Sequence, residues 1–116
     1  MSTHDTIFHA IMRREIPADI VYEDDNIIAF RDIAPQAPVH VLFVPKVDIP
    51  TLDDVKPSQA DIVGGLAVAA AAYARREGLA EDGYRVVINC NRNGGQTVFQ
   101  LHLHLLAGAP LGTFGV

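Results

Sequence analysis

The nine residues VFQLHLHLL at positions 98–106 alternate between two kinds of side chain, and no other pattern in the chain constrains its fold as strongly. A period of two predicts a β-strand whose two faces lie in different surroundings. One face is apolar and should point into a core: Phe99, Leu101, Leu103 and Leu105. The other face carries the candidate site: Val98, Gln100, His102, His104 and Leu106. The chain must therefore cover one side of this strand and present an amide and two imidazoles on the other.

Two histidines at positions i and i+2 of a strand admit three interpretations. His102 and His104 could be half-buried residues that bond to neighbours, two ligands of a zinc ion, or catalytic groups in which a neutral imidazole attacks an electrophile. The turn before them, residues 93–97 (NGGQT), holds a glycine pair and a hydroxyl. Glycine lets main-chain amides approach a ligand closely, which suits a phosphate oxygen. The glycines alone also fit an ordinary hairpin turn, but with the histidines they favour phosphorus chemistry.

Three stretches resemble one known family and cover nearly the whole chain in order. Residues 89–108, NCNRNGGQTVFQLHLHLLAG, resemble the signature of the histidine-triad (HIT) superfamily, in which three histidines alternate with apolar residues. Residues 30–46, FRDIAPQAPVHVLFVPK, resemble the second signature of its HINT branch, the nucleoside phosphoramidate hydrolases. Residues 6–25, TIFHAIMRREIPADIVYEDD, are similar to the start of that branch. The chain departs from the pattern at Gln100, which replaces the first histidine of the triad.

The pattern of residues predicts an α+β domain with a five-stranded antiparallel sheet and two helices, and the resemblance implies that this fold is of the HIT type. The resemblance also implies a homodimer with a continuous ten-stranded sheet. Local patterns predict a short helix capped by Asp5 or Thr6, a long helix over residues 57–77, and strands at 20–22, 27–30, 39–44 and 84–89 besides the histidine strand. With 116 residues, the chain is expected to form a single HIT domain over 1–116. The glycine pair at 64–65 suits close packing within the chain or a contact between subunits.

The resemblance further implies hydrolysis of purine nucleoside 5′-phosphoramidates, so that nucleotides of the AMP or GMP type are the expected ligands. By position, His102 is the nucleophile that forms a covalent nucleotidyl-histidine. His104 stabilises the phosphoryl group, and His40 supports the site from a neighbouring strand. Gln100 should tune the site without abolishing activity, because the family holds its nucleophile through a main-chain carbonyl near this position.

The substrate-binding residues implied by the resemblance form three groups. The phosphate group is assigned Asn89, Gly95, Gln96 and Thr97. The ribose is assigned Asp32, whose two carboxylate oxygens suit a vicinal diol. The nucleobase is assigned an apolar slot: Ile7, Phe8, Ile11, Phe30 and Ile33. No metal or other cofactor is expected, because protein donors neutralise the phosphate.

Charge and cysteine content exclude several other classes. A formal net charge of −5 argues against non-specific binding to nucleic acid, which requires a basic surface. Cys90 is the single cysteine, which excludes an internal disulfide or a cysteine-based zinc cluster and favours the cytoplasm. The N-terminus lacks the pattern of a secretory signal, and the longest apolar stretch, residues 66–74, is too short to span a bilayer.

Several alternatives remain open from the sequence. A HIT fold could instead serve a dinucleoside polyphosphate hydrolase or an adenylyl-adduct hydrolase. Loss of the first triad histidine could leave a catalytically weak nucleotide-binding protein. A zinc-binding module would have to use His102, His104 and His40. Product analysis, nucleotide binding and metal analysis, respectively, would separate these alternatives.

Overall fold

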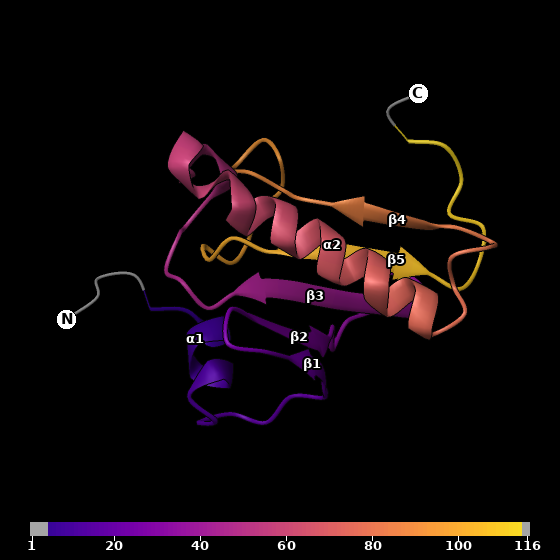
Figure 1. Ribbon diagram of the computed structural model, residues 1–116, viewed down its shortest axis with the longest axis horizontal. Coiled ribbons are helices and arrows are strands. Elements are labelled where there is room, and N and C mark those ends of the chain that lie inside the picture. The colour runs from indigo at the N-terminus through magenta and orange to yellow at the C-terminus, as the bar shows by residue number, and fades with distance from the viewer. Residues whose placement is uncertain (1–4, 115–116) are drawn as a thin grey trace.

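The computed structural model describes residues 5–114, which form one antiparallel sheet with a helix on each face (Figure 1). The strands are β1 (Ile20–Glu23), β2 (Ile27–Arg31), β3 (Val39–Pro45), β4 (Tyr84–Val87) and β5 (Leu103–Ala107). Their order across the sheet is β1-β2-β3-β5-β4, and every neighbouring pair is antiparallel. Within residues 5–114 the predicted α+β architecture of five strands and two α-helices is confirmed.

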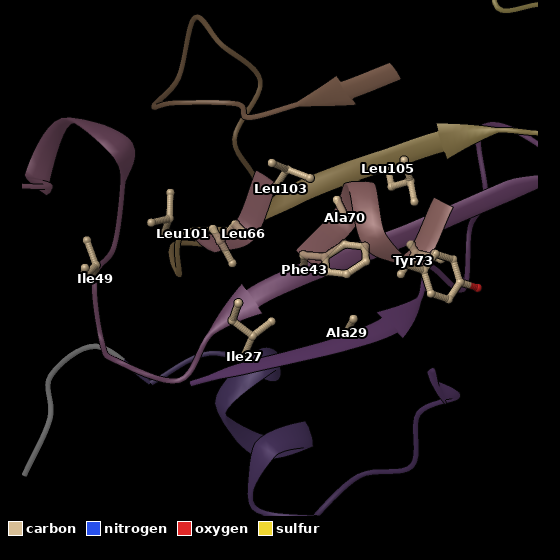
Figure 2. Close-up of a cluster of buried hydrophobic side chains, with 11 residues drawn as sticks. Ile27, Ala29, Phe43, Ile49, Leu66, Ala70, Tyr73, Leu101, Leu103 and Leu105 are labelled. Carbon is tan, nitrogen blue, oxygen red and sulfur yellow. The ribbon is translucent and has the colours of Figure 1, made fainter. Parts of the chain in front are cut away.

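The long helix α2 (Ala60–Arg76) lies across one face of the sheet. Its inward side chains, Leu66, Ala70 and Tyr73, pack against apolar residues of β2, β3 and β5 (Figure 2). Leu101, Leu103 and Leu105 join this core, as the alternation predicted. Two 3-10 turns precede the helix, η1 (Leu52–Asp54) and η2 (Pro57–Gln59), so the residues expected to begin the α-helix form a tighter turn instead.

The short helix α1 (Ile7–Met12) covers the opposite face of the sheet. Thr6 caps it: the hydroxyl accepts the N–H groups of Phe8 and His9, while the His9 ring accepts the N–H of Thr6. Phe8 and Ile11 pack against the alternate side chains of β2 and β3, which are Ile28, Phe30, Leu42 and Val44. α1 therefore faces the side of the sheet that should carry the histidines.

The histidine strand is shorter than predicted, since β5 begins at Leu103 rather than at position 98. β3 ends at Pro45, which would lie opposite Leu101 in the next step of the ladder and has no N–H to donate. Residues 98–102 therefore leave the sheet. Phe99, expected in the core, is 40% exposed, so that prediction was wrong. β4 likewise ends at Val87, two residues before Asn89.

No helix in the described part of the chain is long and apolar enough to cross a membrane. Its longest helix, α2, has 17 residues and carries Asp61 in its first turn and Arg75 and Arg76 in its last. The first four residues of the N-terminus, which was predicted to lack a secretory signal, lie outside the described residues.

Candidate active site

His102 lies immediately before β5, and its ring is held by the main chain. Nδ1 of His102 is 2.7 Å from the carbonyl oxygen of Gln100. A carbonyl oxygen only accepts hydrogen bonds, so Nδ1 carries the proton and Nε2 of the neutral ring keeps its lone pair. Burial lowers the pKa of His102 against the opposing effects of the Gln100 carbonyl and Asp32. The ring is therefore neutral near pH 7, as a nucleophile must be.

His104 and His40 form a chain of hydrogen bonds with a fixed direction. The N–H of Gln36 donates to Nδ1 of His40 at 3.0 Å, so the neutral His40 ring must carry its proton on Nε2. That Nε2 lies 2.9 Å from Nδ1 of His104 and donates to it. His104 then carries its own proton on Nε2. The two histidines of the predicted strand are thus opposite tautomers: His102 offers a lone pair at Nε2, whereas His104 offers an N–H.

Burial keeps this chain of imidazoles uncharged. It lowers the pKa of His104 to about 4, with further lowering by His102 and His40 and an opposing effect of Asp32. Burial also lowers the pKa of His40, and the carboxylate of Asp32 opposes that shift. The tautomers assigned above therefore apply at neutral pH.

A cavity of about 300 Å³ opens beside these histidines and is large enough for a small ligand. Most of the predicted site residues line it: Ile7, Phe8, Ile11, Phe30, Asp32, Ile33, Thr97, His102 and His104. The Phe8 ring meets Phe30 edge-on at 5.4 Å and 68°, and meets His102 at 4.9 Å and 88°. The cavity is therefore lined by apolar and aromatic side chains and by His102 and His104, the two histidines of opposite tautomer.

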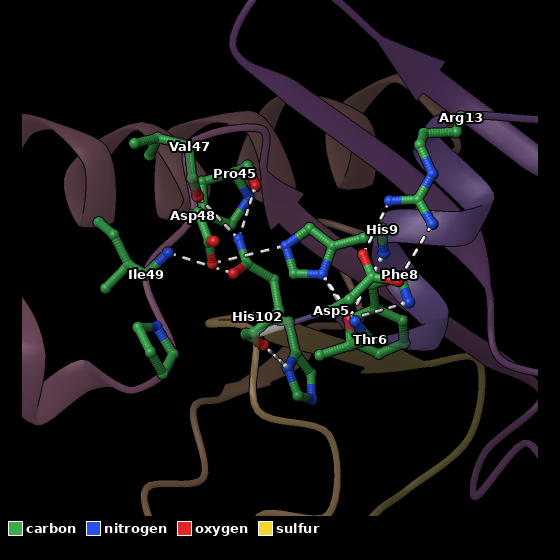
Figure 3. A network of polar contacts seen from close by, with 12 residues as sticks. Asp5, Thr6, Phe8, His9, Arg13, Pro45, Val47, Asp48, Ile49 and His102 are labelled. Carbon is green, nitrogen blue, oxygen red and sulfur yellow. Dashed lines mark hydrogen bonds and ion pairs between the residues drawn. The ribbon is translucent and has the colours of Figure 1, made fainter. Parts of the chain in front are cut away.

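Two of the predicted catalytic residues, His40 and Gln100, do not line the cavity. His40 is buried and acts on the cavity through His104. Gln100 is completely buried, and its amide bonds to the main chain of Pro45, Val47 and Ile49 (Figure 3). Both are therefore placed to hold other residues and not to touch a ligand.

Three residues assigned to the phosphate do not line the cavity. The Asn89 amide donates to the carbonyl oxygen of Gly94 at 2.8 Å. The N–H groups of Gly95 and Gln96 donate to Arg92 and Asn91 within the turn, and the Gln96 side chain bonds to Pro50, Val98 and Asn91. Because these donors stabilise the loop, Thr97 is the residue of the predicted phosphate group that lines the cavity.

Several residues that matter to the site were not predicted from the sequence. Ile16, Pro17, Ala18, Arg31 and Leu42 also line the cavity, as does Val98, which was predicted on the same strand face as the histidines. Gln36 sets the tautomer of His40 through its main-chain N–H. Because this contact does not involve the Gln36 side chain, the type of residue at position 36 gives no indication of it. Nε2 of His9 and a carboxylate oxygen of Asp48 lie 3.5 Å apart outside the cavity lining, and this contact was likewise missed because the two residues are distant in the sequence.

Three residues lie close enough together to hold a metal ion: Asp32, His40 and His104. One possible ligand atom of each lies within 4.8 Å of the others. A histidine that ligates zinc donates its remaining N–H to an acceptor. The remaining nitrogen of His40 instead faces a donor, the N–H of Gln36. The donor set therefore fits a hydrogen-bonded relay and does not fit zinc.

Comparisons with known proteins show the family to which the chain is similar. The model of the HIT domain family matches residues 13–111. The chain is 55% identical over 108 residues to the purine nucleoside phosphoramidase of Escherichia coli K12, covering 93% of this chain and 91% of that protein. It resembles the crystal structure of a HIT family hydrolase from Legionella pneumophila, with 46% identity, a TM-score of 0.90 and coverage of 93% and 96%. A histidine triad protein from Clostridium difficile matches with 42% identity, a TM-score of 0.93 and coverage of 98% and 99%.

Proposed function

The chain belongs to the HIT domain family, and from this we propose that it hydrolyses purine nucleoside 5′-phosphoramidates to the nucleoside monophosphate and an amine. The observation that carries the proposal is the pair of opposite tautomers at one cavity. Nε2 of His102 supplies a lone pair for attack on phosphorus, and Nε2–H of His104 supplies a donor for a phosphoryl oxygen. We also propose that residues 1–116 form a single HIT domain.

The proposed reaction proceeds by two displacements at phosphorus. Nε2 of His102 forms a bond to phosphorus while the bond to the departing amine breaks, which leaves a nucleotidyl-histidine. The departing amine takes one proton from water as the P–N bond breaks. The hydroxide that this water leaves then displaces His102, so that its oxygen and its remaining hydrogen end on phosphorus. The intermediate carries an imidazolium, whose charge the Nδ1–H bond to the Gln100 carbonyl disperses.

Substrate binding follows from the lining of the cavity. We assign the nucleobase to the wall of Phe8, Ile11 and Phe30, where stacking and van der Waals contact are available. We assign the ribose hydroxyls to Asp32, which already accepts the N–H of Ala34 at 2.8 Å through one oxygen. The phosphate then lies between Thr97 and the two histidines. Gln100, His40 and the turn at residues 89–96 support these groups from outside the cavity.

The first test is turnover of adenosine 5′-phosphoramidate at neutral pH. We expect AMP release at about 1 s⁻¹ or faster, the ordinary range for an enzyme with its own substrate. AMP can be followed by chromatography, with Asp53→Ala, which removes an exposed side chain of η1 away from the cavity, as a control. A folded protein that binds AMP but releases none from this substrate would be a nucleotide-binding protein. Faster release from a dinucleoside polyphosphate would instead indicate a phosphoanhydride hydrolase.

We infer that the chain forms a homodimer through β4 and α2. β4 is an edge strand with exposed Tyr84 and Val86, and Val68 on α2 is 67% exposed. A Cβ added at Gly64 would meet no atom within 4 Å, so packing within the chain does not require this glycine. Pairing of two β4 edges would cover these groups and extend the sheet to ten strands.

Light scattering should give twice the chain mass of 12.6 kDa. Val68→Asp should lower the measured mass to that of one chain, because it places a carboxylate in the proposed apolar contact. Ile33→Asp is the matched control, since Ile33 is an exposed apolar residue of the β2–β3 loop. A wild-type protein of single-chain mass at micromolar concentration would contradict the inference.

A further inference from the structure

His9 does not line the cavity, and its ring makes contacts that the proposed reaction does not use. Its Nδ1 accepts the N–H of Thr6 at 3.0 Å, so the neutral ring carries its proton on Nε2. That Nε2 lies 3.5 Å from a carboxylate oxygen of Asp48 (Figure 3). One imidazole therefore connects the cap of α1 to the segment that follows β3.

Asp48 lies in a segment that Gln100 holds on both sides. The Gln100 amide donates to the carbonyl oxygens of Pro45 at 3.0 Å and Val47 at 2.8 Å, and its own oxygen accepts the N–H of Ile49 at 3.1 Å. The main-chain carbonyl of the same Gln100 receives Nδ1–H of His102. Residues 45–49 are thus fixed to the residue that orients the nucleophile.

Phe8 closes these contacts into a ring. It is the neighbour of His9 on α1, and its side chain meets the His102 ring edge-on at 4.9 Å. The path runs from His102 through Gln100 to Val47 and Asp48, then across to His9 and Phe8 and back to His102. Within the described residues, the apolar wall is therefore joined to the nucleophile by two routes. One is the ring contact of Phe8 with His102, and the other runs through the hydrogen bonds of Gln100 and the contact of His9 with Asp48.

We propose that the His9–Asp48 contact is a lock that holds α1 against residues 45–49, and that His9 and Asp48 are positioning residues for nucleotide binding. A helix of six residues has little stability of its own, so its place depends on such tertiary contacts. α1 supplies Ile7, Phe8 and Ile11 to the cavity wall. Opening the lock should therefore weaken binding of the nucleobase. It should affect the chemical step little, because the Gln100–His102 bond stays in place.

The test is a double-mutant cycle with His9→Ala and Asp48→Ala. Its turnover measurements rest on the proposed function, whereas its binding and exchange measurements do not. Asp48→Ala should raise KM for adenosine 5′-phosphoramidate about three- to fivefold, with kcat within about twofold, as expected for a partly exposed polar contact between an imidazole and a carboxylate. The dissociation constant of AMP, measured by titration, should rise by the same factor. The double variant should show less than the product of the two single effects. Asp48→Glu should restore most of the affinity.

Asp53→Ala is the matched control, because it removes an exposed acidic side chain of η1 and should change neither KM nor AMP affinity. Hydrogen exchange of the α1 amides should be faster in Asp48→Ala and unchanged in Asp53→Ala. Unchanged AMP affinity and unchanged α1 exchange in Asp48→Ala would overturn the proposal, and so would a fall in kcat at constant KM. A protein that hydrolyses no phosphoramidate but shows the expected exchange and AMP affinities would overturn the proposed function and leave the lock intact.

Discussion

Replacing His102 with alanine should lower AMP release from adenosine 5′-phosphoramidate by about a thousandfold or more. The substitution removes the lone pair that attacks phosphorus, and removal of a nucleophile usually costs an enzyme at least this much. The rest of the cavity keeps its form, because Phe8 still packs against Phe30 and Ile11 still lies in the same cluster. The variant should therefore remain folded and bind AMP, so that kcat carries most of the loss.

Two measurements make this prediction specific to a covalent route. Mass spectrometry of the wild-type protein, quenched during turnover, should detect a nucleotidyl adduct that is lacking in His102→Ala. His104→Ala should also be slow, yet it keeps the nucleophile and should still form some adduct. Retention of a tenth or more of wild-type activity by His102→Ala would show that water attacks phosphorus directly. The covalent intermediate would then have to be abandoned.

The sequence predicted the sheet and the two helices well because the signals are local. Thr6 caps α1 with its own side chain, and the alternation at Leu101, Leu103 and Leu105 requires only that one face be buried. Phe99 follows the same alternation and is nevertheless exposed. Its exposure depends on Pro45, which ends the ladder from a different strand. A period of two in one segment contains no information about where its partner strand stops.

The site was predicted less completely than the fold, and for a related reason. The residue types at His102, His104 and Asp32 are recognisable because their side chains carry chemistry. The N–H of Gln36 and the carbonyl of Gln100 set two tautomers, and every residue except proline can supply the first while any residue can supply the second. Such main-chain contacts become visible only when the backbone is placed.

Replacing Gln100 with leucine should lower the free energy of unfolding by about 3–5 kcal/mol. The side chain has similar size but satisfies none of the three main-chain groups that the amide now bonds: the carbonyls of Pro45 and Val47 and the N–H of Ile49. Each buried group left without a partner costs about 1–3 kcal/mol, and local rearrangement recovers part of the sum. The loss is a large share of the stability of a small domain, about 5–15 kcal/mol. Urea unfolding followed by circular dichroism measures it directly.

Gln100→His distinguishes the structural role of this position from a chemical one. A neutral histidine offers one donor and one acceptor, so it can satisfy two of the three groups and should lower the free energy of unfolding by about 1–2 kcal/mol. Its activity should stay close to wild type, because His102 is oriented by the main-chain carbonyl of residue 100, which is present whatever the side chain. A wild-type protein with very low activity that Gln100→His raised by a large factor would show that the first triad position acts in catalysis. The glutamine would then mark a protein that has moved from hydrolysis toward nucleotide binding.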